Sequence, residues 1–399
     1  MKTFDSSPYK GTRDFYPEDF LKHQYIFDTW SSTLKQHGFE QYDTSVLENA
    51  ELYIAKSGEE LGGSQLYNFY DKGDRFVALR PEMTPSLARI VANKFGELRF
   101  PLRWFSIPNC FRYERPQKGR LREHWQLNVD IIGLEAGEAE VEILSMVGNL
   151  FKSFGATKDH FKVMYNHRQV LDTWLEEYGI ATDSGIYGIL DDWFKVDDET
   201  KKIQLDEVIG SDKTQGIFNL TSKSGTEWQR YQQIALDYDE IKLIQSLVPA
   251  IHPDLEYELN PCIIRGIAYY TGLVYEAFDK NPENSRALFG GGRYDTLLEM
   301  FGKSQPAIGF GWGDVTMTEF LDGHNLWPED ISKPVTKVGI LPASRDDLHE
   351  LYQTILPNLI SKQQAYDIDY DYSRSENKRW QSLKKRGCDS IIKVGSFGV

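Results

Sequence analysis

CFRYERPQKGRLREHWQLNVDIIG, residues 110–133, is the stretch of the sequence that says most about the fold. Apolar and polar side chains alternate at both of its ends, a pattern typical of β-strands. Pro116 and Gly119 interrupt its middle, as they would in the loop of a hairpin. The stretch therefore predicts two antiparallel strands, at about residues 103–114 and 122–132.

Polar side chains recur on one face of this predicted hairpin. Residues two apart on a strand point to the same side of a sheet, so Arg112 and Glu114 would share a side. A guanidinium suits a phosphate and keeps its charge, whereas a buried carboxylate suits an amino or imidazole group. A solvated basic loop is the alternative, but polar groups on both strands favour a binding floor. The return strand contributes the residues His124, Gln126, Asn128 and Asp130.

The same stretch resembles a known motif. R-Y-E-R-P-Q-K-G-R-L-R-E-H-W-Q, residues 112–126, is similar to the second signature motif of class II aminoacyl-tRNA synthetases, in the form that histidyl-tRNA synthetases use. K-G-T-R-D-F-Y-P, residues 10–17, resembles the opening of the same family and precedes a helix predicted from Pro17. The resemblance implies an α+β fold: an antiparallel sheet flanked by helices, a helical insertion and a C-terminal α/β domain.

Length and composition set the wider bounds. A chain of 399 residues exceeds what one hydrophobic core usually supports, so two or three domains are expected. No apolar run approaches eighteen residues, which predicts no contact with a membrane through a spanning helix. The N-terminus lacks the apolar segment of a secretion signal, and the three cysteines are widely scattered. These features favour a reducing compartment and a cytoplasmic protein.

FVALRPEMTP, residues 76–85, predicts a strand followed by a helix that begins near Thr84. A helix N-cap is one role for this threonine, since proline follows it. The family resemblance implies a second role, in which Glu82 and Thr84 bind the α-amino group of L-histidine. It implies the same for Gln126 and Asp130 on the return strand of the hairpin.

ELNPCIIRGIAYYTGLVYEAFD, residues 258–279, predicts mostly strand and places one arginine in an apolar context. An arginine at a sheet edge with packed tyrosines is the structural alternative. The string is similar to the histidine-specific motif of histidyl-tRNA synthetases. The resemblance implies that Arg112 and Arg265 bind histidine and act in catalysis, on opposite sides of the α-phosphate. It also places Tyr269 and Tyr270 near the imidazole.

An ATP site in this chain must be built on a sheet with arginines, because neither G-x-x-x-x-G-K-[ST] nor a Rossmann-type glycine pattern occurs. The resemblance implies ATP as a substrate, with Mg²⁺ on its β- and γ-phosphates. AIGFGWGD, residues 307–314, resembles the third class II motif, but Thr316 replaces the arginine that normally stacks on adenine. Ala268 stands where many members of the family carry aspartate, and the plant organellar forms that the sequence resembles have alanine there. The expected ATP-binding residues are Arg112, Glu114, Arg120 and Arg122.

The remaining segments give the expected domain order. A catalytic domain is predicted at residues 1–325, with a charged helical insertion at about 172–250 in which no chemistry is visible. Residues 326–336 predict a linker. Residues 337–399 alternate strands and helices, which implies a parallel sheet, and they resemble a shortened anticodon-binding domain.

A helix predicted at residues 376–386 is unusually basic, on a chain whose net charge of −15 opposes nucleic-acid binding. Spacings of six and seven residues put several of its cations on one side. A solvated helix face is the alternative to a contact with tRNA. The candidate tRNA-binding residues are Lys378, Arg379, Lys384, Lys385 and Arg386.

The activity implied by the resemblance is formation of histidyl-adenylate from L-histidine and ATP, followed by transfer to tRNA(His), in a homodimer. Two other functions remain open. One is a non-aminoacylating paralogue such as an ATP phosphoribosyltransferase regulatory subunit, against which the arginine-rich hairpin and the C-terminal domain argue. The other is a histidine-binding module without catalysis, which Thr316 and the short C-terminal domain would fit.

Overall fold

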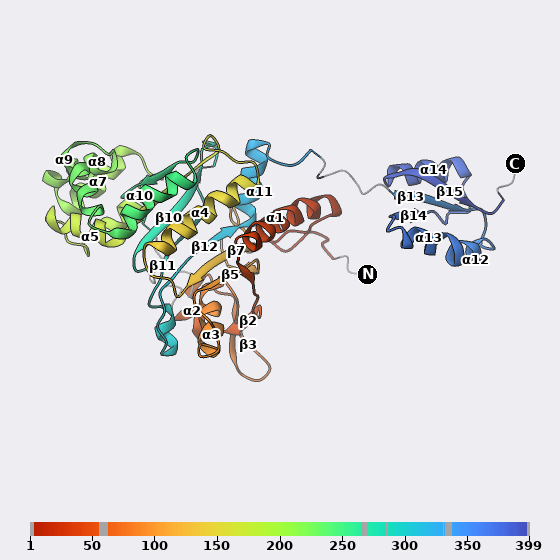
Figure 1. Cartoon of the computed structure of the whole chain (residues 1–399), viewed down its shortest axis with the longest axis horizontal. Helices are drawn as coiled ribbons and strands as arrows, with labels where there is room; N and C mark the ends of the chain where they lie inside the picture. Colours follow the sequence, from red (N-terminus) through yellow and green to blue (C-terminus); the bar gives the residue numbers. More distant parts are fainter. Residues whose placement is uncertain are drawn as a thin grey trace. The chain divides into compact units, whose positions relative to one another are not determined.

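The computed structural model describes residues 4–55, 63–264, 270–284, 286–329, 331 and 337–396. Contacts between residues divide the chain into two units, Met1–Pro328 and Glu329–Val399 (Figure 1). Arg265, Ala268 and Tyr269 lie outside the described residues, as does most of the predicted linker.

A nine-stranded sheet forms the centre of the first unit. Its strands are β1 (Glu40–Gln41), β5 (Leu102–Ser106), β6 (Asn109–Phe111), β7 (Glu123–Ile132), β8 (Phe161–His167), β9 (Tyr257–Leu259), β10 (Leu273–Asp279), β11 (Ala287–Arg293) and β12 (Ala307–Gly313). They lie in the order β1-β5-β7-β12-β11-β10-β8-β9, and β6 pairs with β7. The pairs from β5 through β8 are antiparallel, whereas β1–β5 and β8–β9 are parallel. The predicted antiparallel sheet is therefore confirmed.

The predicted hairpin is present, but its outgoing strand is not continuous. β5 ends at Ser106 and β6 begins at Asn109, with Pro108 between them. Proline has no N–H to donate to the ladder, so the strand breaks there, and the carbonyl of Pro108 instead accepts from the Gln126 N–H at 3.0 Å. Arg112 lies just beyond the end of β6, although its N–H still donates across the hairpin to the Arg122 carbonyl at 2.9 Å.

Three helices cover one face of this sheet: α1 (Pro17–Gln36), α4 (Glu138–Ser153) and α11 (Asp314–His324) (Figure 1). The predicted first helix is confirmed, including its start at Pro17. The interior is aromatic: the ring centroids of Phe151 and Phe161 are 3.6 Å apart, and those of Trp30 and Trp312 are 5.8 Å apart. Burying such large side chains against the sheet is the main source of stability for this layer.

The other face carries α3 (Thr84–Asn93) beside a small antiparallel sheet of order β2-β4-β3 and a 3₁₀ helix, η2 (Leu297–Phe301). Residues 39–47, whose sequence pattern predicts one strand, instead contribute to two separate strands, β1 and β2. Thr84 is the first residue of α3 and Met83 holds the N-cap position, so the predicted capping role of Thr84 is wrong. The small sheet consists of β2 (Leu47–Asn49), β3 (Asn68–Tyr70) and β4 (Phe76–Leu79), with α2 (Ala50–Ile54) beside it.

The insertion between β8 and β9 is helical, as predicted. Its helices are α5 (Arg168–Glu177), α6 (Ile186–Asp191), α7 (Asp198–Ile209), α8 (Ser211–Thr221), α9 (Gly225–Ala235) and α10 (Asp239–Ile251). The glycines at 210 and 216 predict a loop between them, but this prediction is wrong because α8 begins at Ser211. Gly210 alone separates α7 from α8. Its φ is positive (85°), a backbone conformation that glycine adopts without strain.

The second unit is a three-stranded parallel sheet of order β14-β13-β15, which confirms the predicted sheet type. Its elements are β13 (Lys337–Pro342), α12 (Leu348–Glu350), the π-helical turn η3 (Leu351–Ile355), α13 (Leu356–Ser361), β14 (Tyr366–Ile368), α14 (Glu376–Lys385) and β15 (Cys388–Val394). Ile340 and Leu351 are fully buried in its core. None of the helices in the described part of the chain has the length and apolar character to cross a membrane.

Candidate active site

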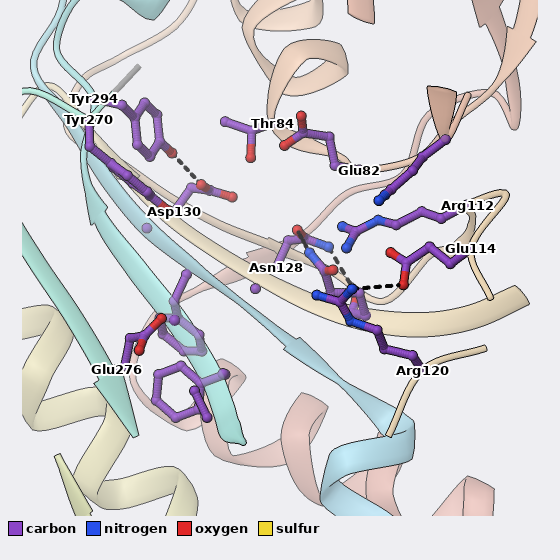
Figure 2. Close-up of a pocket in the computed structure, with 18 residues that line it drawn as sticks. Glu82, Thr84, Arg112, Glu114, Arg120, Asn128, Asp130, Tyr270, Glu276 and Tyr294 are labelled. Carbon is purple, nitrogen blue, oxygen red and sulfur yellow. Dashed lines mark hydrogen bonds and ion pairs between the residues drawn. The ribbon is translucent and has the colours of Figure 1, made fainter. Parts of the chain in front are cut away.

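A cavity of about 310 Å³ opens on the α3 side of the main sheet, over β7 and the strands next to it (Figure 2). Loops after β4 and β6 supply one wall, and the glycine-rich strands β11 and β12 supply another. Eight of the predicted binding residues line this cavity, together with Asn128 of the predicted floor: Glu82, Thr84, Arg112, Glu114, Arg120, Gln126, Asp130 and Tyr270.

The floor of the cavity is the polar face of β7 that the alternation predicts. Gln126 Nε2 donates to Asn128 Oδ1 at 2.8 Å, and Asn128 Nδ2 donates to the Gln126 carbonyl at 2.9 Å. Glycines on β12 make room for this floor. A Cβ added at Gly309 would lie 2.3 Å from Asp130 Oδ1, and one at Gly311 would lie 2.2 Å from Gln126 Nε2. A side chain at either of these β12 positions would therefore collide with a residue of the cavity floor.

Asp130 marks the buried end of the cavity. Its side chain accepts a hydrogen bond from the hydroxyl of Tyr294, and Tyr270 lies beside this pair (Figure 2). Burial raises the pKa of the Asp130 carboxyl to about 7, although the tyrosine hydroxyl acts to lower it. Glu82 and Thr84 face this end from the opposite wall. A small cationic group such as an ammonium would relieve the cost of ionising Asp130 here.

Arginines mark the other end. Arg112 Nε donates to the carbonyl of Pro81 at 2.8 Å, which holds the guanidinium over the floor. Arg120 pairs with Glu114 at 3.3 Å (Figure 2). The cavity is thus acidic at one end and has two guanidinium groups at the other. This arrangement suits a ligand pair in which an amino group sits deep and a phosphate lies toward the arginines.

Arg122 is placed differently from the sequence-based expectation, because the structure puts it outside the cavity. Its guanidinium carbon lies 4.2 Å from the ring centroid of Tyr113, and Nη1 donates to Tyr9 Oη at 3.1 Å. Its stem also fills the space beside Gly11, where an added Cβ would lie 2.8 Å from Arg122 Cγ. Arg122 fastens the N-terminal segment to the hairpin and does not reach the ligand space.

Several lining residues were missed by sequence reasoning, although one of them, Glu276, stands inside the string 258–279 that the resemblance covers. Glu276 on β10 points into the cavity, and Tyr294 follows β11 (Figure 2). A carboxylate in the apolar run of a predicted strand was the available signal for Glu276. Arg265 and Tyr269 lie outside the described residues, so their roles stay predictions.

A smaller cavity of about 140 Å³ adjoins the first at its arginine end and shares Arg112 with it. His124 lines this space, and burial, with the nearby Arg112 charge, lowers its pKa to about 3, so the imidazole is neutral. Thr316 lies here too, where the third motif usually has arginine. Its hydroxyl donates to the Leu288 carbonyl at 2.7 Å and lies 3.0 Å from the Gly313 carbonyl, so its hydrogen-bonding capacity is used by the backbone.

A buried carboxylate behind the floor joins three distant segments. Asp314, at the start of α11, accepts from the Trp125 N–H at 2.9 Å and from Arg13 Nη2 at 2.7 Å. His23 Nε2 lies 3.4 Å away. Burial acts to raise the pKa of Asp314, but the contacts with His23 and Arg13 outweigh it and lower that pKa. Through its bonds to Trp125 and Arg13, Asp314 links β7, and with it the cavity floor, to the N-terminal segment.

The basic helix of the second unit corrects one expectation. Arg379 is buried, and its Nη1 donates to the Pro342 carbonyl at 2.9 Å while Nε pairs with Asp369 at 3.2 Å. It is a structural residue of that domain and cannot face tRNA. Arg386 is exposed but pairs with Asp367 at 3.0 Å. The exposed cations that remain on α14 are Lys378, Lys384 and Lys385.

Comparison with known proteins gives a consistent result. A sequence model of the family described as Histidyl-tRNA synthetase matches residues 11–313. The chain is 41% identical to Histidine--tRNA ligase of Leptospira biflexa, covering 96% of this chain and 90% of that protein. It is 37% identical to the chloroplastic/mitochondrial Histidine--tRNA ligase of Arabidopsis thaliana, covering 92% and 76%.

Solved structures share the fold at lower identity. A Bacillus halodurans protein described as an ATP phosphoribosyltransferase regulatory subunit/histidyl-tRNA synthetase superposes with a TM-score of 0.78 at 20% identity, over 98% of this chain and 99% of that one. Apo histidyl-tRNA synthetase of S. aureus gives 0.69 at 22% identity, over 98% and 92%. At these sequence identities the structural similarity shows a shared fold and nothing more.

Proposed function

The chain belongs to the histidyl-tRNA synthetase family. We propose that the two ends of its cavity bind the two substrates of this family's reaction. The activity is that of a histidine–tRNA ligase: L-histidine and ATP give histidyl-adenylate and diphosphate, and the histidyl group then passes to tRNA(His) with release of AMP. The observation that supports this assignment of the two substrates is a single cavity with a buried carboxylate at one end and two guanidinium groups at the other.

The deep end binds histidine. Asp130, Glu82, Thr84 and Gln126 surround its α-amino group, and Tyr270, with Tyr269, lies near the imidazole. A pocket built from hydrogen bonds discriminates strongly, because an analogue that lacks the matching group leaves buried polar atoms unpaired. The ammonium group would also stabilise the ionised form of Asp130, which burial otherwise disfavours.

The arginine end binds ATP. A histidine carboxylate oxygen attacks the α-phosphorus, the bond to the bridging oxygen breaks, and diphosphate leaves with the bonding electrons. Such an in-line displacement needs positioning and charge neutralisation more than an acid or a base. Arg112 and Arg265 supply that charge, and Glu114 and Arg120 contact the nucleotide. Arg122 has no part in this contact.

Mg²⁺ enters this proposal with the nucleotide. Within the described residues, no group of three or more His, Cys, Asp or Glu side chains is placed to hold a metal ion. Magnesium commonly takes most of its ligands from substrate phosphates and water, with one or two carboxylates. ATP would therefore bind as its magnesium complex.

The second unit binds tRNA in this proposal. Residues 329–399 hold 11 basic and 10 acidic side chains, whereas the whole chain holds 45 and 60, so this part is free of the strong negative charge of the rest. Lys378, Lys384 and Lys385 offer exposed cations on α14. Replacing each of them by alanine should flatten the log–log salt dependence of tRNA binding by about 0.7–0.9 per lost phosphate contact.

A homodimer in the cytoplasm completes the proposal. On the small sheet, Leu47 pairs with Leu79 and Phe69 pairs with Val77, so all four side chains share one face. Leu47 and Phe69 are exposed, and an apolar exposed face of this kind suits a protein–protein contact. The three cysteines are free and buried, which fits a reducing compartment.

Histidine-dependent exchange between ATP and diphosphate tests the proposed function. The purified full chain should catalyse exchange and charge tRNA(His), and deleting residues 337–399 should abolish charging while exchange survives. Absence of exchange with histidine bound would instead indicate a histidine-binding module. Absence of both would favour the non-aminoacylating paralogue.

A further inference from the structure

A third cavity, of about 250 Å³, continues the site outward. It shares Gly119, Leu288 and Thr316 with the 140 Å³ cavity, which in turn shares its arginine wall with the main cavity. The three spaces therefore adjoin in a row, from Asp130 at the deep end to the tip of the hairpin loop. The outermost one has no role in the site as described so far.

Two exposed cations line this outer cavity. Lys118 comes from the hairpin tip, and Arg286 comes from the connection that leads into β11; both are exposed. In the described part of the chain neither forms an ion pair, whereas Arg120 is held by Glu114 at 3.3 Å and Arg293 by Glu140 at 2.6 Å. Exposed cations without partners remain available to a ligand anion.

The hairpin tip is fixed next to Arg286. The N–H of Gly119 donates to Glu319 Oε1 on α11 at 3.0 Å. A Cβ added at Gly119 would lie 3.7 Å from Arg286 Cδ, and the φ of 74° there is one that other residues rarely adopt. The glycine thus lets the loop approach both α11 and Arg286. Thr316, on the same wall, is neutral, and its hydroxyl already donates to the Leu288 carbonyl.

We propose that this outer cavity binds the β- and γ-phosphates of ATP and the diphosphate formed from them, with Arg286 as its principal cation and Lys118 as the second. The inference rests on the proposed function and deepens it. If the α-phosphate lies at Arg112, the leaving diphosphate must point away from the histidine, and the row of cavities leads outward from there. Arg286, just before β11, then supplies the positive charge that Thr316 on α11 cannot supply.

The acidic residues of the same cavity agree with a magnesium-bound polyphosphate. Glu283 and Glu319 line it together with the two cations. A bare polyphosphate would be repelled by these carboxylates, but one that carries Mg²⁺ presents positive charge to them. Gln117 and Asn284 add neutral hydrogen-bonding groups. The mixture of signs is what distinguishes this space from the histidine end.

Arg286→Ala and Arg286→Lys test the inference in the exchange reaction, with Arg99→Ala as the matched control. Arg99 is also exposed, forms no ion pair among the described residues, and lines none of the three cavities. We expect Arg286→Ala to raise the KM for both ATP and diphosphate roughly tenfold or more, with the KM for histidine unchanged. Arg286→Lys should recover most of the loss, and Arg99→Ala should match the wild type.

Other outcomes would overturn the inference in distinguishable ways. A raised KM for ATP with an unchanged KM for diphosphate would place the nucleotide base in this cavity. Slower transfer to tRNA with normal exchange would place the acceptor end there, and unchanged kinetics would remove Arg286 from the site. If the wild type lacked exchange, the proposed function would fail instead. Calorimetric binding of Mg·ATP and of magnesium diphosphate to wild type and Arg286→Ala would still decide the cavity's ligand.

Discussion

Replacing Asp130 by asparagine should stabilise the ligand-free protein above pH 7 and, at the same time, remove the carboxylate that histidine needs. Asp130 is 4% exposed, lies against Gly309 and accepts a hydrogen bond from Tyr294. Burial raises the pKa of its carboxyl from 3.8 to about 7. The folded protein therefore keeps this carboxyl protonated in a range where the unfolded chain has already ionised it.

The sign and size of the effect follow from that difference. Between about pH 4 and 7 the folded state binds more protons than the unfolded state, so this carboxyl's contribution to the free energy of unfolding falls as pH rises. A shift of this size corresponds to roughly 4 kcal/mol in total. Asparagine cannot ionise. Asp130→Asn should thus gain up to roughly 4 kcal/mol over the wild type by pH 8, relative to its difference near pH 4.

Urea unfolding of wild type and Asp130→Asn at each pH from 4 to 8 measures this, because other titrating groups cancel in the difference between the two proteins. Tyr294→Phe is the matched control, since it removes the hydrogen bond that lowers the pKa and should move the titration upward. A stability difference that stays constant across this pH range would show that Asp130 ionises normally and would refute the reasoning. The KM for histidine should rise at least tenfold, as expected for a lost charge-assisted contact.

Three further outcomes are expected. Gln126→Ala should raise the KM for histidine in the exchange assay, and an unchanged KM would remove this amide from the amino-acid site. Arg265→Ala should lower the kcat of exchange by ~10²–10³, as for other groups that stabilise transition-state charge, and near-normal turnover would contradict that role. Asp314→Asn should destabilise the protein by roughly 3–5 kcal/mol at pH 7, because Arg13 and His23 lose their buried partner. The lowered pKa makes this loss shrink as pH falls through the acid range, which thermal unfolding at several pH values would show.

The cavity floor could be predicted because it depends on a local rule. The period of two along a strand places Gln126 and Asp130 on one face whatever else the chain does, and the structure confirms it. Arg112 and Glu114 also reach the cavity, although they do so from the loop beyond β6 rather than from a strand. The motif resemblance assigned Glu82 and Thr84 to the same site, and both side chains line the cavity.

What could not be predicted depends on partners distant in the sequence or fixed only by folding. Arg122 turns away because Tyr9 and Tyr113 hold its guanidinium, and nothing near it in the sequence indicates this. Arg379 is buried because a second strand brings Asp369 beneath it, so helical spacing alone gave the wrong face. Tyr294 meets Asp130 across 164 positions of the chain, a contact that alternation cannot reveal.

The N-terminal segment has a practical consequence for anyone preparing this protein. The carbonyl of Gly11 accepts from the N–H groups of Arg122 and Glu123 at 2.8 and 3.2 Å, at the point where the active-site loop returns to β7. An affinity tag, a fusion partner or a protease nick that displaces residues 9–13 would loosen that loop while leaving the core folded. Low activity in such a preparation would then report on the tag rather than on the enzyme, and a C-terminal tag avoids the ambiguity.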